Sequence, residues 1–261
     1  MEYSARINAG SHQLFFQTLG KGEPTVVFES GGGCGADSLM NLAQQVQSFA
    51  RALVYDRAGL GQSDPASRPR TIRDAVNDLH ALLHTARVPG PYLLVGHSFG
   101  GLIIRLYANQ YPLEVVGLVL LDVPHPEQSL RDLQLLPDPS PGESPALTAF
   151  RDTLKAEWTD PFSDEEGFDR VASAAQVLAG GHLGDLPLVV ITAGIDEWEP
   201  EFPTEIAHAL SRNWMQKQQE LVRLSNNGRH IIATESTHAI QDCQPDLVID
   251  VIAKLVEELR N

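Results

Sequence analysis

Short apolar runs alternate with longer amphipathic stretches through most of the chain. Five of the runs have the length of a buried strand, namely residues 25–28, 52–55, 92–95, 115–121 and 188–191. Between most of them, apolar residues recur at the spacing of one helix face. Strands that are buried on both faces and separated by helices are typical of a parallel sheet. We therefore predict an α/β fold with a mostly parallel sheet flanked by helices.

The two ends of the chain add to this pattern. β-like stretches at 4–7 and 13–18 flank the turn-forming residues 8–11, which predicts an opening β-hairpin. Thr71 is a candidate cap for one helix, and Pro245 is suited to open the last one. Both helices carry a single apolar stripe, which we assign to the core. The stripes are Ile72, Ala75, Val76, Leu79, Leu82, Leu83 and Ala86, and Leu247, Val248, Val251, Ile252, Leu255, Val256 and Leu259.

The alternation stops between residues 124 and 185. Prolines cluster near the start of this segment, and acidic residues follow at 157, 160, 164, 165, 166 and 169. A segment of this length without function is uncommon. We predict a small helical cap at 124–185 over the carboxyl edge of the sheet, a core formed by 1–123 and 186–261, and a solvated acidic face. Candidate cavity walls in the cap are Phe150, Trp158, Phe162, Phe168, Leu178 and Leu183.

The composition restricts partners and compartment. The chain has 19 Lys and Arg against 34 Asp and Glu, a formal net charge of −15, which disfavours binding to nucleic acid or to anionic lipid. No apolar run has the length of a membrane helix, and the first residues do not resemble a signal peptide. With only two cysteines, the chain fits a reducing compartment. We expect a cytoplasmic protein without nucleic-acid or membrane partners, and the oligomeric state stays unknown.

Residues 96–100 (GHSFG) lie between the apolar run 92–95 and the helix-like run 102–108. A G-x-S-x-G turn needs glycines because the bend is strained and the neighbouring strand and helix leave no room for β-carbons. The turn exposes the hydroxyl of its serine. Ser98 is therefore the candidate nucleophile.

A serine hydroxyl needs a base to act at neutral pH, and the base needs an orienting acid. His238 is the candidate base because it follows the strand-like run 229–234, and loops at the carboxyl ends of parallel strands meet at one edge of the sheet. His97 is expected to pack or to fix the turn, and His80 and His84 fall on a helix, where solvation explains them. Asp122 and Asp196 both follow strands, so either could be the acid. No spacing of His, Cys or carboxylate residues resembles a metal-ligand set.

The tetrahedral intermediate of acyl transfer needs two donors for its oxygen. The Phe99 amide, at the start of a helix, is one candidate. The second is expected from the glycine-rich residues 29–35, where we favour the amide of Gly32.

Four motifs together resemble the α/β-hydrolase fold superfamily, in the order of that family and over nearly the whole chain. Ser30-Gly31-Gly32 stands where members commonly have His-Gly-x, and residues 55–64 (YDRAGLGQSD) resemble the D-x-R-G-x-G-x-S turn. Residues 96–100 resemble the nucleophile elbow, and His238 with residues 244–246 completes the set. The resemblance implies a cap inserted after the sixth strand.

The resemblance also bears on the acid. The common G-x-x-D after the seventh strand is one residue shorter here, as Gly194-Ile195-Asp196. Some members take the acid from the end of the sixth strand, and residues 122–128 resemble such a group. We therefore choose Asp122, with Asp196 as the alternative.

A serine esterase-like member of this family would cleave carboxylic esters of small or medium acyl substrates through a Ser98–His238–Asp122 triad, without a cofactor or metal. Gly32 and Phe99 would form the oxyanion hole. The same triad supports amidase, proline iminopeptidase, lactonase, thioesterase, carbon–carbon hydrolase and perhydrolase chemistry, so the ester rests on analogy. Epoxide and haloalkane hydrolysis need a carboxylate at position 98 and are disfavoured.

Two other readings compete. A non-catalytic ligand-binding protein could use the same fold. A dinucleotide-binding protein would explain residues 31–36, which fit G-x-G-x-x-A, and Asp56 at the end of the next strand. That reading leaves Ser98 and His238 unexplained.

Overall fold

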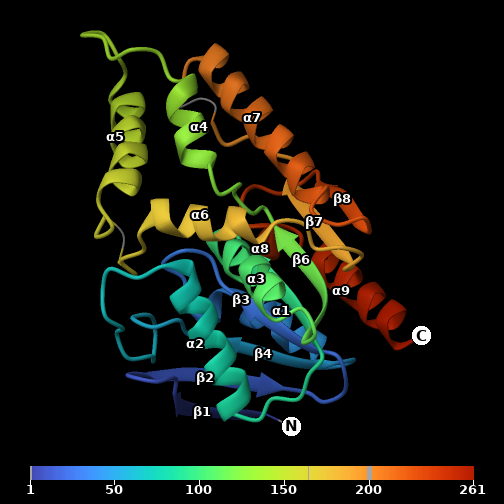
Figure 1. Cartoon of the computed structure of the whole chain (residues 1–261). Coiled ribbons are helices and arrows are strands. Elements are labelled where there is room, and N and C mark those ends of the chain that lie inside the picture. The colour runs from blue at the N-terminus through green and yellow to red at the C-terminus, as the bar shows by residue number, and fades with distance from the viewer. Residues whose placement is uncertain (1, 164, 199–201) are drawn as a thin grey trace.

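A sheet of eight strands forms the centre of the computed structural model, which describes residues 2–163, 165–198 and 202–261 (Figure 1). The strand order is β1-β2-β4-β3-β5-β6-β7-β8. β1 pairs antiparallel with β2 and β2 with β4, and the remaining pairs are parallel. The predicted hairpin and mostly parallel sheet are thus confirmed. The strands are β1 (Tyr3–Asn8), β2 (Gln13–Leu19), β3 (Thr25–Glu29), β4 (Arg51–Tyr55), β5 (Tyr92–His97), β6 (Val115–Leu121), β7 (Leu188–Ala193) and β8 (Gly228–Ala233).

Helices cover both faces of the sheet. They are α1 (Met40–Val46), which follows the short η1 turn (Ala36–Leu39), α2 (Ile72–Thr85), α3 (Phe99–Gln110), α4 (Gln128–Leu135), α5 (Pro145–Thr159), α6 (Arg170–Gly180), α7 (Thr204–Val222), α8 (Ile240–Cys243) and α9 (Pro245–Arg260). Successive strand residues point to opposite faces, so Val27 packs with α2 and α3 and Val26 with α1 and α9. Burial on both sides explains why the parallel strands are continuous apolar runs. None of the helices described is long and apolar enough to cross a membrane.

Local sequence signals set the ends of two helices. The backbone N–H of Thr71 donates to Asp74 Oδ2 at 2.7 Å in a capping box at the start of α2. Pro245 is the first residue of α9, where a missing N–H breaks no helical hydrogen bond. The α2 stripe is almost completely buried, and the central residues of the α9 stripe join the core on the other face.

The segment between β6 and β7 carries α4, α5 and α6. Leu147 and Leu154 of α5 pack with Phe202 and Leu210 in a separate apolar cluster. Figure 1 shows α4 between α5 and the first half of α7, beyond the end of the sheet. In contrast, α6 packs on α2 and α3, and its Val177 belongs to the main core. The bounds of a separate cap stay a prediction.

The predicted solvated acidic face is wrong for Glu166, and Asp169 has a structural role as a helix cap. Glu166 is buried with only 4% of its surface exposed, and Asp169 caps α6 by accepting the N–H of Ala172 at 2.8 Å. Both carboxylates therefore serve the fold, because each satisfies buried or helix-end donors. Asp164 lies outside the described residues.

Candidate active site

Ser98 alone forms the turn between β5 and α3, since β5 ends at His97 and α3 begins at Phe99. Its φ of 49° is rare for a residue other than glycine and stores about 1–3 kcal/mol of strain. A β-carbon on Gly96 would lie 2.8 Å from Gly101 Cα, and one on Gly100 would lie 2.4 Å from the Ser30 carbonyl oxygen. The predicted lack of room for side chains beside Ser98 is confirmed.

His238 follows β8, and its Nδ1 lies 2.7 Å from Asp122 Oδ2. Asp122 directly follows β6 and has a positive φ of 46°. Its other oxygen, Oδ1, accepts hydrogen bonds from the Ala193 N–H at 3.0 Å and from Trp214 Nε1 at 3.1 Å. The carboxylate side chain is 4% exposed, whereas the imidazole is 42% exposed. A buried and fully hydrogen-bonded acid thus holds a partly accessible base.

Asp196 makes different contacts. It accepts hydrogen bonds from the backbone of Trp198 at 2.9 Å and from the hydroxyl of Ser211. These bonds stabilise the turn after β7, which is a common task for an aspartate at a strand end. Of the two candidate acids, Asp122 is the one in contact with His238.

His97 supports the loop that carries His238. Its Nε2 donates to the backbone carbonyl of His238 at 3.0 Å, and the two rings lie 4.8 Å apart between centroids. Burial, reinforced by the nearby His238, lowers the pKa of His97 to about 4. His97 is therefore neutral at physiological pH, and its expected packing role is confirmed.

Arg57 holds the glycine-rich loop 30–35 through two of its backbone carbonyls. Its guanidinium donates at 2.6 Å to the carbonyl of Ser30 and at 2.6 Å to that of Gly31. Glu166 binds both the loop and Arg57, accepting the Gly33 N–H at 2.9 Å and two bonds of 2.7 Å from Arg57. The loop is thereby clamped between an arginine after β4 and a glutamate from the segment before α6.

The charges of this clamp are almost completely buried. The side chains of Arg57 and Glu166 are 2% and 3% exposed, and Glu29, which also pairs with Arg57, is fully buried. Burial alone would raise the pKa of Glu166, but the hydrogen bonds and charge of Arg57 outweigh it and lower that pKa. For Glu29, burial wins and raises the pKa. Arg57 and Glu166 therefore form a charged pair. Removing either charge would leave the remaining one buried without this partner.

One cavity of about 950 Å³ collects the residues singled out by the sequence. Its lining includes Ser98, Phe99, Gly32, Asp122 and His238. Ser98 and His238 share this cavity, although no direct hydrogen bond joins them within the part of the chain that the structure describes. The lining also contains an apolar group and three carboxylates: the apolar group is Phe150, Trp198, Phe202, Trp214 and Met215, and the carboxylates are Glu157, Asp196 and Glu197.

The aromatic wall differs from the prediction. Phe150 lines the cavity, and its ring packs at a tilt against those of Trp198 and Phe202, with centroids 5.3 and 5.2 Å away. The other five predicted wall residues do not line it. Phe168, for example, is buried with its ring centroid 4.8 Å from that of Phe99. It lies just before α6, which packs on α2 and α3.

The sequence model of the alpha/beta hydrolase fold family matches residues 24–230. The chain belongs to the α/β-hydrolase fold family.

Proteins similar to this α/β-hydrolase include an uncharacterized sequence relative and solved structures with different printed activities. The uncharacterized protein YqjL of Bacillus subtilis is 29% identical over 226 residues, which cover 86% of this chain and 80% of YqjL. A thermophilic esterase from Thermogutta terrifontis superposes with a TM-score of 0.67 at 16% identity, covering 99% of this chain and 100% of the esterase. The haloalkane dehalogenase DatA of Agrobacterium tumefaciens has a TM-score of 0.65 at 16% identity, covering 99% and 97%. At these identities, the solved structures establish the fold alone.

Three contributors to this hydrolase's site were not foreseen. Trp214, in the middle of α7, carries no sequence signal for contact with Asp122. Glu166 belongs to a run of acidic residues that reads as a surface. Arg57 does have a signal, since it stands in the Asp56-Arg57 turn motif.

The dinucleotide-binding hypothesis requires Asp56 to be free to bind a ribose, and it is not. Both oxygens of Asp56 accept backbone hydrogen bonds, from Ala36 at 2.7 Å and from Gln62 at 2.8 Å, and the residue is 5% exposed. A buried carboxylate committed to two turns is not available to a ribose.

Proposed function

We propose that this protein is a serine hydrolase that cleaves carboxylic esters of small or medium acyl substrates through an acyl-enzyme intermediate. The observation that carries the proposal is the convergence of Ser98, the His238–Asp122 pair and two candidate amide donors on one cavity. The esterase among the structural relatives is consistent with this reaction class.

Asp122 keeps His238 in the form that the reaction needs. Because Asp122 accepts a hydrogen from Nδ1, the neutral imidazole presents an unprotonated Nε2. That nitrogen can take the proton of Ser98 while Oγ attacks the carbonyl carbon of the ester. Hydrogen bonds between a nucleophile and its base are often long in unliganded enzymes and tighten when substrate is bound.

The negative charge that develops on the carbonyl oxygen needs donors in place beforehand. The Phe99 N–H has no partner within α3, because it belongs to the first turn of that helix. We propose that it acts together with the Gly32 N–H, in the loop clamped by Arg57 and Glu166. His238 then returns its proton to the departing alcohol, and a water molecule activated by the same imidazole hydrolyses the acyl-enzyme.

The side chains that line the cavity indicate which substrates it can bind. The aromatic group of Phe150, Trp198 and Phe202 is suited to an apolar acyl or alcohol part, since aromatic side chains bury large apolar areas. At position 98, a hydroxyl takes the place of the carboxylate that haloalkane hydrolysis requires, which favours acyl transfer.

A fluorophosphonate probe tests the mechanism directly, because it reacts with activated serines. We expect a stoichiometric adduct at Ser98, identified by peptide mass spectrometry, and no adduct in Ser98→Ala. Ser129→Ala is the matched control, since Ser129 lines the same cavity and should not affect labelling. Absence of an adduct at Ser98 would contradict the proposal and favour a ligand-binding protein.

A substrate panel tests the ester assignment separately. Nitrophenyl esters of increasing acyl length should be turned over faster than aminoacyl anilides, with a maximum at short or medium chains. A preference for anilides would keep Ser98 as nucleophile and replace the esterase by an amidase or peptidase.

A further inference from the structure

His80, His84 and Glu114 meet at the amino-terminal edge of the sheet, opposite the cavity of Ser98. His80 and His84 stand one turn apart on α2, and Glu114 directly precedes β6. The Nε2 atoms of both histidines approach the same oxygen, Glu114 Oε1, at 3.2 and 3.1 Å. One donor atom from each residue lies within 4.8 Å of the other two.

Two of these three separations, those from each histidine nitrogen to Glu114 Oε1, match the spacing of ligands around a small cation. A tetrahedral zinc ion binds nitrogen and oxygen at about 2.0–2.1 Å, which places its ligands roughly 3.3 Å apart. The two nitrogen–oxygen separations already have this value. Two imidazoles and one carboxylate also form a ligand set that zinc uses when a fourth position is left to water.

Neighbouring side chains orient the three groups. The Tyr107 hydroxyl donates to the other carboxylate oxygen of Glu114 at 2.6 Å, so that oxygen is occupied and Oε1 faces the histidines. Tyr111 stacks on the ring of His80 with centroids 3.9 Å apart. Such outer contacts fix the direction of metal ligands in proteins.

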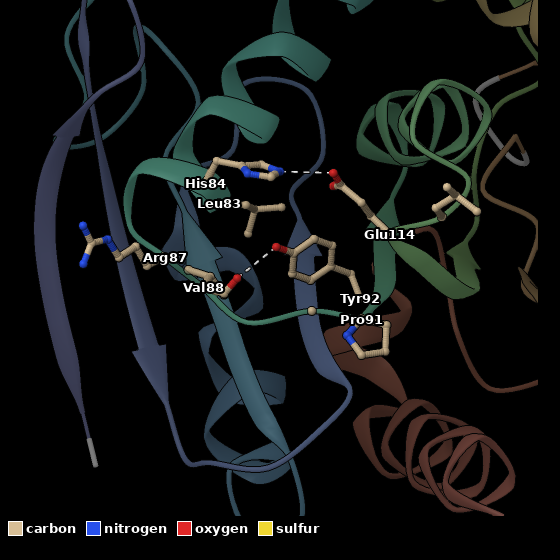
Figure 2. A pocket seen from close by; sticks show the side chains of 9 residues that line it. Leu83, His84, Arg87, Val88, Pro91, Tyr92 and Glu114 are labelled. Atoms are coloured by element: carbon tan, nitrogen blue, oxygen red, sulfur yellow. Dashed lines mark hydrogen bonds and ion pairs between the residues drawn. The ribbon is translucent and has the colours of Figure 1, made fainter.

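The surroundings give access and favour a cation. His84 and Glu114 line a cavity of about 510 Å³ that could admit an ion and its water. Figure 2 shows the His84 imidazole facing Glu114, while the guanidinium of Arg87 points away from the pair. The net charge of −15 adds a long-range attraction for cations.

We propose that His80, His84 and Glu114 bind one zinc ion, with water as the fourth ligand. The ion would tie the end of α2 to the start of β6 and thereby stabilise the fold. It would not take part in turnover, because Ser98 lies at the opposite edge of the sheet.

Isothermal titration of the untagged, EDTA-treated protein with zinc chloride tests the proposal. We expect one zinc per chain, and a thermal midpoint that rises by roughly 5 °C at a hundredfold excess over Kd. Cobalt(II) should show the intense visible bands of a tetrahedral site, and magnesium should not compete, since it prefers oxygen ligands.

Variants assign the ligands. His84→Ala and Glu114→Gln should each weaken zinc binding by roughly 100-fold, and Tyr107→Phe by about tenfold, as for outer-shell residues. His208→Ala, which removes an exposed histidine from α7, should bind zinc like the original protein. His84 is itself 58% exposed, so its removal should leave the protein folded. Unchanged zinc affinity in His84→Ala, or no saturable binding in the original protein, would overturn the proposal.

Discussion

The two edges of the parallel sheet carry polar clusters that are built in different ways. At the carboxyl edge, Ser98 and Asp122 have positive φ values of 49° and 46°, and the charges of Arg57 and Glu166 are almost fully buried. At the amino edge, His80 and His84 stand on regular helix and are 28% and 58% exposed.

This difference shows how strongly the surrounding structure constrains the residues of each cluster. Strained backbone and buried charge persist only where the surrounding structure enforces them, so the carboxyl edge is tied into the core. The amino edge uses side chains that an ordinary helix places at the right spacing. Substitutions should therefore have large effects at the first edge and small ones at the second.

The largest effect is expected for Asp122→Asn. Oδ1 of Asp122 accepts two donors, so the new amide should turn its oxygen there and its NH₂ toward His238. Nδ1 of His238 must then accept a hydrogen bond, so the hydrogen of the neutral imidazole lies on Nε2. With Nε2 protonated, His238 cannot act as the base for Ser98. We expect kcat to fall by about 10⁴-fold, as for the equivalent change in a serine protease triad.

Asp196→Asn is the matched control for that experiment and should change kcat by less than about tenfold. Steady-state kinetics on one nitrophenyl ester compares the two variants. A greater loss at Asp196 would refute Asp122 as the orienting acid.

Glu166→Gln should have the next largest effect. Its amide cannot accept every bond from Arg57, and one charge of the buried pair is lost, which typically costs about 3–5 kcal/mol. The freed glycine loop should also lower kcat by roughly tenfold, because small displacements of catalytic groups are costly.

Urea unfolding and ester kinetics measure the two consequences of Glu166→Gln. Glu165→Gln removes the same charge from the exposed neighbour and should leave both values close to the original. Equal behaviour of the two variants would show that the clamp does not support the loop.

The stability of the carboxyl edge should depend on pH through His97. Its pKa is about 4 in the folded protein, below the ordinary 6.5, so between these values the unfolded chain binds more protons. The unfolding free energy should therefore fall as the pH is lowered from 6.5 to 4, by at most about 3 kcal/mol from this residue, and no further below it.

Urea titrations at several pH values test this contribution. His97→Gln keeps a hydrogen-bond donor without a titrating ring, so its stability should decline less over the same range. Parallel pH curves for the two proteins would exclude His97 as a source of the decline.

The smallest effect is expected at the amino edge. Without zinc, His84→Ala should change the unfolding free energy by less than about 0.5 kcal/mol, as is usual for surface substitutions. Its ester turnover should stay within about twofold of the original. A large loss of activity would mean that the two edges are coupled.

Much of this molecule could be predicted because the signals are local. The apolar runs, the cap at Thr71, the proline that opens α9 and the glycines around Ser98 each act within a few residues. Such patterns define strands, helix ends and one tight turn before any long-range contact is considered.

Other features depend on distances between remote parts of the chain. His238 and Asp122 are 116 positions apart, and Gly33 and Glu166 are 133 apart. The sequence shows that Asp122 and Asp196 follow strands, but not which of them reaches the imidazole of His238. It also cannot distinguish a buried glutamate such as Glu166 from a solvated one.

The sequence by itself determined the fold class, the helices and strands, and the turn that carries Ser98, since each follows from periodicity or from backbone constraints on neighbouring residues. Only the tertiary structure decided that Asp122 contacts His238, that Glu166 clamps the glycine loop, and that Glu114 joins two histidines of α2. These are matters of packing, in which the direction of a side chain is set by residues far away in the chain.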